Sequence, residues 1–184
     1  MTLTQYYVAA TVDGLIADEE DSLDWLFTAR SEEGGPPNYA EFISAVGAIA
    51  MGSTTYEWIL RHSAATSGDS TPVTWPYDLP CWVFTHRDLP RASSKSSIVF
   101  TSDDVRSVHA EMTAAAGDRN VWMMGGGDLA GQFADAGLLD ELILAIAPTT
   151  LGAGAPLLPR RLPLRLEDVR RSLDFTCIRY TVVR

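Results

Sequence analysis

The chain has 184 residues with a formal net charge of −10, and its composition is 46% hydrophobic and 21% charged. This length and composition are ordinary for one globular domain with its own core, so we expect a single domain over residues 1–184. The acidic balance argues against a nucleic-acid surface, which needs a basic stripe. A local pocket of arginine side chains and backbone N–H groups could still bind an anionic ligand such as a phosphate.

The sequence also bears on location. No apolar run approaches the ~18 residues of a membrane-spanning helix, and the first residues lack the basic stretch and apolar core of a signal peptide. Cys81 and Cys177 fall in predicted strands, where we expect buried, unreactive thiols. We therefore expect a cytoplasmic protein with no membrane partner.

Strand and helix patterns alternate along most of the chain. A strand is predicted over 6–10, a helix over 38–46 and a short buried strand over 48–51. Thr54 and Glu57 form a T-x-x-E capping box that opens a helix running through Leu60. The elements expected further along are strands over 81–85, 97–101, 120–124 and 142–147, and helices that begin after Ser102 or Asp103 and at Asp128 and end at Gly117 and Gly137.

Two stretches, 31–38 and 62–80, are rich in Gly, Pro and polar residues and are predicted loops. A loop as long as the second is usually functional or disordered. Residues 163–183 are predicted to form two strands with a turn near 172–174. The alternation favours a mainly parallel sheet covered on both faces, and the tail favours an antiparallel edge. The predicted fold class is α/β: a three-layer α/β/α sandwich with a mixed, mainly parallel sheet and an antiparallel C-terminal edge.

Three consecutive glycines, Gly125, Gly126 and Gly127, stand between a predicted strand and a predicted helix. In an open α/β sheet this position lies beyond the carboxyl end of a strand, where glycines let the backbone approach a pyrophosphate. A tight turn that needs a positive φ explains the glycines equally well. The G-x-G-x-x-G fingerprint of dinucleotide-binding folds is absent.

Two further turns have a similar composition. Residues 51–55 read as strand, glycine, hydroxyl cluster and helix start, although helix capping alone explains Thr54. Thr85, His86 and Arg87 follow another strand, and an arginine beside a hydroxyl suits a phosphate monoester. Taken together, such turns favour a nucleotide ligand that contacts the protein at two ends.

The motifs that carry a family resemblance are AATVDGLIA (9–17), LDWL (23–26), MGSTTYE (51–57), WPY (75–77), GGG (125–127), LLDEL (138–142) and PTTLGAGAPL (148–157). In this order they resemble the reductase domain of bifunctional riboflavin-biosynthesis deaminase-reductases, and most closely the stand-alone, dihydrofolate-reductase-like branch. The resemblance covers nearly the whole chain. It implies a dihydrofolate-reductase-like fold and an NADPH site.

The resemblance also implies roles for individual residues. Backbone atoms of Ala9 and Ala10 would border the nicotinamide, and Ile16 would cover it. The residues implied for the phosphates and the ribose are Gly52, Ser53, Thr54, Thr55, Thr85, His86, Arg87, Gly125, Gly126, Gly127, Asp128 and Leu129.

The sequence departs from two related activities. Folate reductases carry a carboxylate near the start of their first long helix, where this chain has Asn38, and an arginine before the third strand, where it has residues 78–80. Folate reduction is therefore disfavoured, and Asn38 is either a substrate contact or a helix cap. The H-x-E and P-C-x-x-C pattern of the zinc deaminases is missing, and with three histidines and two distant cysteines we expect no metal site.

Hydride transfer needs a nearby acid or an ordered water to deliver a proton. The candidates are Asp13, Asp24, Glu41 and Tyr56. Three of them have a structural alternative: a turn at Asp13, a helix cap at Glu41 and core packing at Tyr56. Trp25 could stack on a flat substrate or simply pack in the core.

Three functions stay open on the sequence. The first is an NADPH-dependent reductase of a small heterocyclic or carbonyl substrate. The second is a nucleotide-binding module that kept the fold and lost the chemistry, and the third is an interaction protein with no nucleotide site. Gly126→Val should abolish cofactor binding under the first two and alter only stability under the third. The family also commonly dimerises, which implies a homodimer whose candidate contact is residues 156–159 with the two tail strands.

Overall fold

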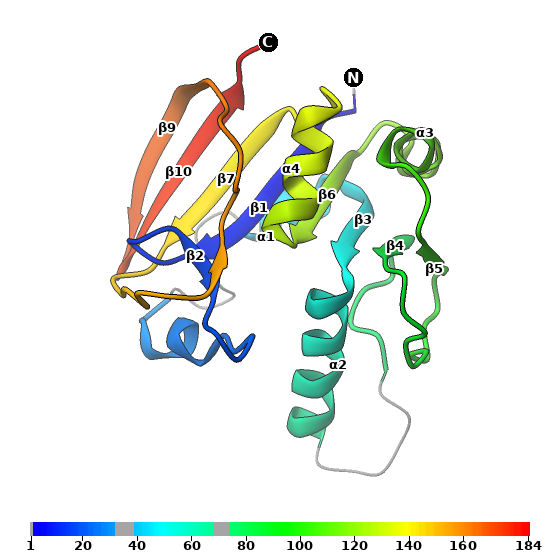
Figure 1. Cartoon of the computed structure of the whole chain (residues 1–184), viewed down its shortest axis with the longest axis horizontal. Coiled ribbons are helices and arrows are strands. Elements are labelled where there is room, and N and C mark those ends of the chain that lie inside the picture. The colour runs from blue at the N-terminus through cyan, green and yellow to red at the C-terminus, as the bar shows by residue number, and fades with distance from the viewer. Residues whose placement is uncertain (1, 32–38, 68–73) are drawn as a thin grey trace.

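The computed structural model describes residues 2–31, 39–67 and 74–184. Its centre is one sheet of eight strands: β1 (Thr4–Ala10), β3 (Val46–Gly52), β4 (Cys81–Phe84), β5 (Ile98–Thr101), β6 (Asn120–Gly125), β7 (Glu141–Ile146), β9 (Leu164–Ser172) and β10 (Phe175–Val182). The strand order is β5-β4-β3-β6-β1-β7-β10-β9 (Figure 1).

All strand pairs from β5 across to β7 are parallel, whereas β10 is antiparallel to both β7 and β9. The predicted mixed sheet with an antiparallel C-terminal edge is therefore confirmed. Consecutive parallel strands are joined by crossover connections, each of which contains a helix except the one between β4 and β5, whereas the antiparallel tail folds back through a tight turn. Leu173 makes that turn with a positive φ of 48°.

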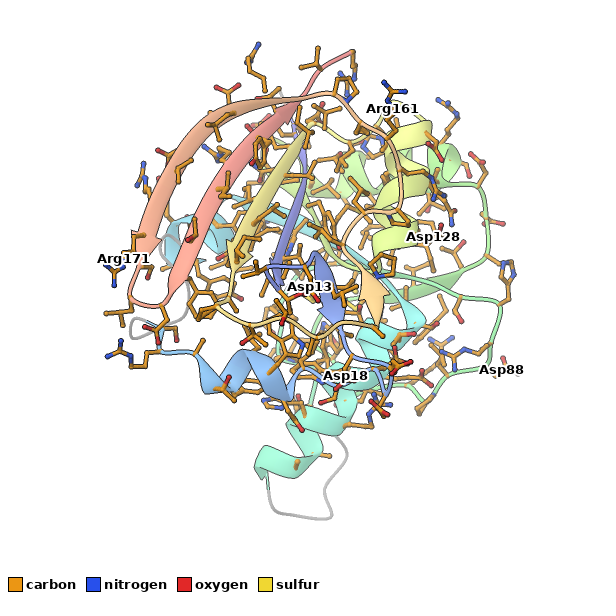
Figure 2. The ribbon with its side chains drawn as sticks, turned by 60° about the vertical axis from the view of Figure 1, so that its left-hand side comes forward. Asp13, Asp18, Asp88, Asp128, Arg161 and Arg171 are labelled. Carbon is orange, nitrogen blue, oxygen red and sulfur yellow. The ribbon has the colours of Figure 1, made fainter. Side chains whose placement is uncertain are left out.

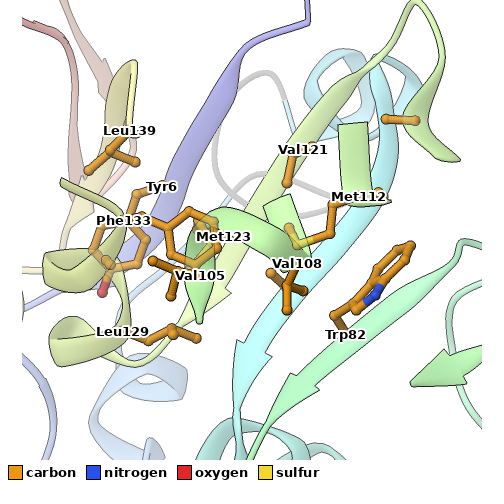
Figure 3. Packing of buried hydrophobic residues seen from close by; sticks show 14 of the residues in the cluster. Tyr6, Trp82, Val105, Val108, Met112, Val121, Met123, Leu129, Phe133 and Leu139 are labelled. Carbon is orange, nitrogen blue, oxygen red and sulfur yellow. The ribbon is translucent and has the colours of Figure 1, made fainter. Parts of the chain in front are cut away.

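Helices cover both faces of the sheet. They are α1 (Tyr39–Ser44), α2 (Ser53–Ser67), α3 (Val105–Ala116) and α4 (Gly127–Asp135). A short 3-10 helix, η1 (Asp24–Thr28), precedes α1 in the chain. On one face Met112 of α3 and Phe133 of α4 belong to the same buried cluster as Tyr6 (Figure 3). On the other face Phe42, from α1, packs beside Tyr7 with ring centroids 4.4 Å apart. Neighbouring strand residues point to opposite faces, so Tyr6 and Tyr7 belong to two separate cores, and the three-layer sandwich is confirmed.

A second, two-stranded sheet lies at the carboxyl ends of the parallel strands. It pairs β2 (Leu15–Ala17) with β8 (Ala155–Pro156). Neither strand was expected from the sequence, because two- and three-residue strands carry no detectable period. In Figure 1 this small sheet stands in front of β1 and above η1.

Several predicted boundaries were wrong. Strand β3 begins at Val46, inside the predicted helix 38–46, because residues 46–51 are all buried. Helix α2 runs to Ser67, so the first part of the predicted loop 62–80 is helical. Thr54 lies within the first turn of α2 rather than before it, and Glu57 binds Arg87 instead of closing a capping box. The cap of α3 is Asp104, whose carboxylate accepts a hydrogen bond from the Arg106 N–H.

The two cysteines differ. Cys81 is fully buried, and burial raises the pKa of its thiol, as expected for an unreactive core cysteine. Cys177 is only partly buried, so the expectation of burial was too strong there. Within the described ranges no helix is long and apolar enough to cross a bilayer.

Candidate functional site

Two adjoining cavities lie at the carboxyl ends of the parallel strands. The first, here called the polar cavity, has a volume of about 420 Å³ and is lined by Gly52, Ser53, Thr54, Thr55, Phe84, Thr85, His86, Arg87, Thr101, Ser102, Asp103, Gly126, Asp128, Leu129 and Gln132. The second, the apolar cavity, has a volume of about 310 Å³ and is lined by Val8, Ile16, Ala17, Asp21, Leu23, Thr54, Thr55, Trp58, Met124, Gly125, Gly126, Gly127, Asp128, Ala155 and Pro156. Four residues line both, so the cavities form one groove: Thr54, Thr55, Gly126 and Asp128.

The fold itself requires two of the three consecutive glycines. A Cβ atom at Gly125 would collide with the Thr55 side chain, and one at Gly127 would collide with the Pro156 carbonyl. Gly126 caps α4 with a φ of 96°, and its nearest neighbour outside the adjacent residues, the Leu129 Cβ, is 3.5 Å from a Cβ built there. Gly126 is therefore the one of the three glycines at which both interpretations still apply: its φ is positive, and its position on the groove leaves room for a ligand to approach the backbone.

The other two predicted turns meet the same groove. A Cβ at Gly52 would find nothing within 4 Å, so the backbone between β3 and α2 is open to a ligand. Across the polar cavity the Thr85 hydroxyl accepts a hydrogen bond from the Arg87 N–H at 2.9 Å. The Arg87 guanidinium is held by the Glu57 carboxylate, with Nη2 and Oε2 2.7 Å apart. The structure thus brings together three stretches that are distant in the sequence.

The charges around the polar cavity are mixed. Arg87 faces it together with two carboxylates, Asp103 and Asp128. Hydrogen bonds from Gln132 and then from Arg160 hold the pKa of Asp128 below its usual value, so this group stays ionised at neutral pH. Arg160 partly compensates the charge, because its guanidinium lies 2.9 Å from Asp128 Oδ1.

Two of the proposed proton donors have structural contacts instead. The Asp13 carboxylate accepts hydrogen bonds from the Thr11 hydroxyl and from the N–H groups of Leu151 and Gly152, which lowers its pKa. The Tyr56 hydroxyl donates to the Pro90 carbonyl at 2.9 Å and accepts from a backbone N–H. Neither residue lines the groove, and Figure 2 shows Asp13 and Asp128 on separate elements. These contacts favour the turn and core-packing alternatives.

Three further predicted residues, Asp24, Trp25 and Glu41, also lie off the groove. Asp24 is exposed at the start of η1, and Glu41 lines a separate hollow of about 210 Å³ on the α1 face. Trp25 is 7% exposed and packs with Phe175, as the core-packing alternative expects. Asn38 lies outside the described residues.

Neither Ala9 nor Ala10 of β1 lines the groove. Ala10 is fully buried, and Ala9 packs against the cluster that holds Trp25. Val8 is the β1 residue that lines the apolar cavity. The role that the resemblance gives to the backbone of Ala9 and Ala10 stays a prediction.

Thirteen residues of the groove were not selected from the sequence: Val8, Ala17, Asp21, Leu23, Trp58, Phe84, Thr101, Ser102, Asp103, Met124, Gln132, Ala155 and Pro156. Two of these could have been found. Trp58 follows Thr54 by one helical turn, and Gln132 follows Asp128 by one turn, so each faces the same way as a residue already chosen. Asp21 has a positive φ of 57° in a loop with no periodic pattern, and nothing in the sequence singles it out.

The fold and the groove define an α/β domain of the dihydrofolate-reductase-like type with a site for an elongated ligand. Residues 4–176 match the family model of the RibD C-terminal domain, and the chain belongs to that family.

The relatives agree with this assignment. The chain is 32% identical over 172 residues to the uncharacterized protein YwjB of Bacillus subtilis, covering 91% of each chain. A crystal structure of a Shewanella protein assigned provisionally to riboflavin biosynthesis matches with a TM-score of 0.78 at 23% identity, over 100% of both chains. A deaminase and 5-amino-6-(5-phosphoribosylamino)uracil reductase of Thermotoga maritima matches with a TM-score of 0.62 at 13% identity. That match covers 99% of this chain and 57% of the longer enzyme.

Proposed function

We propose that this protein is an NADPH-dependent oxidoreductase that transfers hydride to a small heterocyclic or carbonyl compound, in a reaction related to the reductase step of riboflavin biosynthesis. One observation carries the proposal: three separate turns converge on a polar cavity that continues into an apolar one. A dinucleotide with phosphates at one end and a flat ring at the other has the same division of chemistry.

The residues of the groove fit such a ligand. The start of α2 offers backbone N–H groups together with the hydroxyls of Ser53, Thr54 and Thr55, and α4 begins directly after Gly126. Helix N-termini favour phosphate oxygens, and Arg87 suits the additional phosphate that distinguishes NADPH from NADH. Val8, Ile16 and Met124 would exclude water from the ring end. When bound, the nicotinamide supplies the hydride.

Proton delivery is assigned to water. The only described residues of the apolar cavity with an ionisable side chain are Asp21 and Asp128. Asp128 is stabilised in its ionised form, which makes it a poor acid at neutral pH. The poor acidity of Asp128 also favours the second candidate function, a nucleotide-binding module that does not catalyse hydride transfer.

The first experiment is a titration of the purified protein with NADPH and, separately, with NADH, followed by nicotinamide fluorescence. We expect micromolar binding of NADPH and weaker binding of NADH. Gly126→Ala should weaken NADPH binding, because the added Cβ and the altered backbone both act at the groove. Gly137→Ala is the matched control, since Gly137 also has a positive φ, 71°, but ends α4 away from both cavities.

The outcomes separate the alternatives. NADPH binding with substrate-dependent loss of nicotinamide absorbance supports the reductase. Binding with no turnover on pyrimidine, pterin and carbonyl compounds supports the nucleotide-binding module. No binding of either dinucleotide refutes both and leaves the interaction protein.

We also propose a homodimer that forms through β9, the edge strand of the sheet. Leu166 and Val169 are 55% and 54% exposed on this strand, although both are large apolar residues. Exposed apolar side chains on an unpaired edge strand favour pairing with a second copy, although β9 also carries five charged residues. Leu157 and Leu158 are partly buried against the core of the same chain, so they offer less surface to a second copy than β9 does.

A further inference from the structure

The apolar cavity has a one-sided charge distribution. Its described lining includes no arginine, lysine or histidine, and the two charged side chains, Asp21 and Asp128, are both acidic. Arg160 binds Asp128 but does not line the cavity. An anionic group placed here would meet two carboxylates and no cation.

One wall of this cavity is aromatic and held in place. Trp58 lines the cavity and stacks on His62, with ring centroids 4.7 Å apart and planes inclined by 12°. His62 stacks in turn on Phe27 of η1 at 5.4 Å and 1°. This three-ring stack joins α2 to η1 and fixes the tryptophan beside Leu23. A fixed aromatic wall is suited to a flat conjugated ring.

The volume of the apolar cavity limits the size of the compound that can bind beside the nicotinamide. About 310 Å³ is at the small end of ligand pockets, which span roughly 300–1,000 Å³. A nicotinamide ring at the Gly125 end would leave room for only a small compound beside Trp58.

We infer that the hydride acceptor of this protein is a small, flat, uncharged conjugated compound, and that phosphorylated compounds are excluded from the apolar cavity. The inference rests on the proposed function, since it concerns the ring end of the same groove. It separates this chain from the Thermotoga maritima reductase, whose name describes a phosphoribosyl compound. A phosphate needs cationic partners, and Arg87, the arginine that lines the groove, faces the polar cavity instead.

The test compares two probes that share a ring and differ in charge. Menadione is an uncharged quinone, and naphthoquinone sulfonate carries a fixed negative charge on the same ring system. Binding of each is measured by isothermal titration calorimetry in the presence of NADP⁺, and binding of NADP⁺ itself is measured separately. We expect the wild-type protein to bind menadione at least tenfold more tightly than the sulfonate.

Asp21→Asn tests the cause of that preference. Asparagine has the same shape and tolerates a positive φ, so the loop is expected to keep its conformation. The variant should bind the sulfonate several-fold more tightly and menadione with unchanged affinity. Glu19→Gln is the matched control, because Glu19 is exposed in the same loop and lines neither cavity.

Equal or tighter binding of the sulfonate by the wild type would overturn the inference, and so would failure to bind either probe. An unchanged preference in Asp21→Asn, or the same change in Glu19→Gln, would overturn the role of the cavity charge. If the wild-type protein does not bind NADP⁺, the proposed function is refuted. The affinities for the two quinones, measured without dinucleotide, would still test the charge preference of the apolar cavity.

Discussion

Replacement of Arg87 by Gln is expected to remove the preference for NADPH over NADH. Arg87 is the arginine that lines the polar cavity. Its backbone N–H donates to the Thr85 hydroxyl, and its guanidinium is positioned by the Glu57 carboxylate. A hydrogen bond to a charged group contributes about 1.5–3 kcal/mol. Because the Arg87 side chain is 54% exposed, the lower end applies, and about 1.5 kcal/mol corresponds to a roughly tenfold loss of NADPH affinity.

Replacement of Glu57 is expected to change the NADPH affinity in the opposite direction. Its carboxylate competes with a phosphate for Arg87, and partly exposed ion pairs of this kind contribute about 0.2–1 kcal/mol. Glu57→Gln should therefore raise the affinity for NADPH by up to about fivefold, without changing the affinity for NADH. Both variants are assayed by fluorescence titration with each dinucleotide at fixed ionic strength, since exposed charges are screened by salt.

Arg61→Gln is the control for net charge, because Arg61 lies one turn beyond Glu57 on α2 and does not line the cavity. If Arg87→Gln and Arg61→Gln weaken NADPH binding equally, the effect is one of overall charge. If Arg87→Gln leaves the ratio of NADPH to NADH affinity unchanged, the assignment of the phosphate to this corner of the groove is refuted.

Three further predictions concern stability and assembly. Hydrogen bonds from the side chain and backbone of Arg30 lower the pKa of Asp174 to about 2, so this contact stabilises the fold fully above pH ~4 and its contribution is lost as the pH falls through about 2. Asp174→Asn should lower the melting temperature at pH 6 and lower it much less at pH 2. Gly127→Ala should destabilise the protein by about 1–3 kcal/mol in urea unfolding, because its Cβ meets a backbone carbonyl, whereas Gly52→Ala has open space and should cost less. Leu166→Glu should convert a dimer to a monomer in light scattering coupled to gel filtration, and a wild-type monomer would refute the β9 contact.

Periodic features of the fold could be predicted from the sequence, and pairwise contacts could not. The strand-helix alternation and the antiparallel tail follow from local patterns, and the structure confirms both. The end of α2 was predicted seven residues too early, because its last two turns, through Ser67, carry little amphipathic pattern. The cap of α3 was displaced because three consecutive polar residues, 102–104, could each have filled that position.

In the site, too, residues next to a recognisable strand end could be predicted, whereas roles that depend on contacts with distant parts of the chain could not. The turn at Gly126 and the arginine after β4 were recognised because each lies next to a strand end. The reason for Gly125 and Gly127 lies elsewhere in the chain, in Thr55 and Pro156, and a single sequence does not reveal such contacts. Asp13 was misleading for the same reason, because its partners at Leu151 and Gly152 come from a distant turn.

Residues 155–160 connect the two ends of the groove. Pro156 pairs with Leu15 of β2 at the ring end, and the Leu157 N–H donates to the Gly14 carbonyl at 2.8 Å. A few residues later Arg160 binds Asp128 at the phosphate end. The loop over the ring end therefore cannot lift away without pulling on the segment against which α4 begins. We therefore expect opening of one end to loosen the other, so that a ligand that engages both ends orders the groove at one entropic cost instead of two.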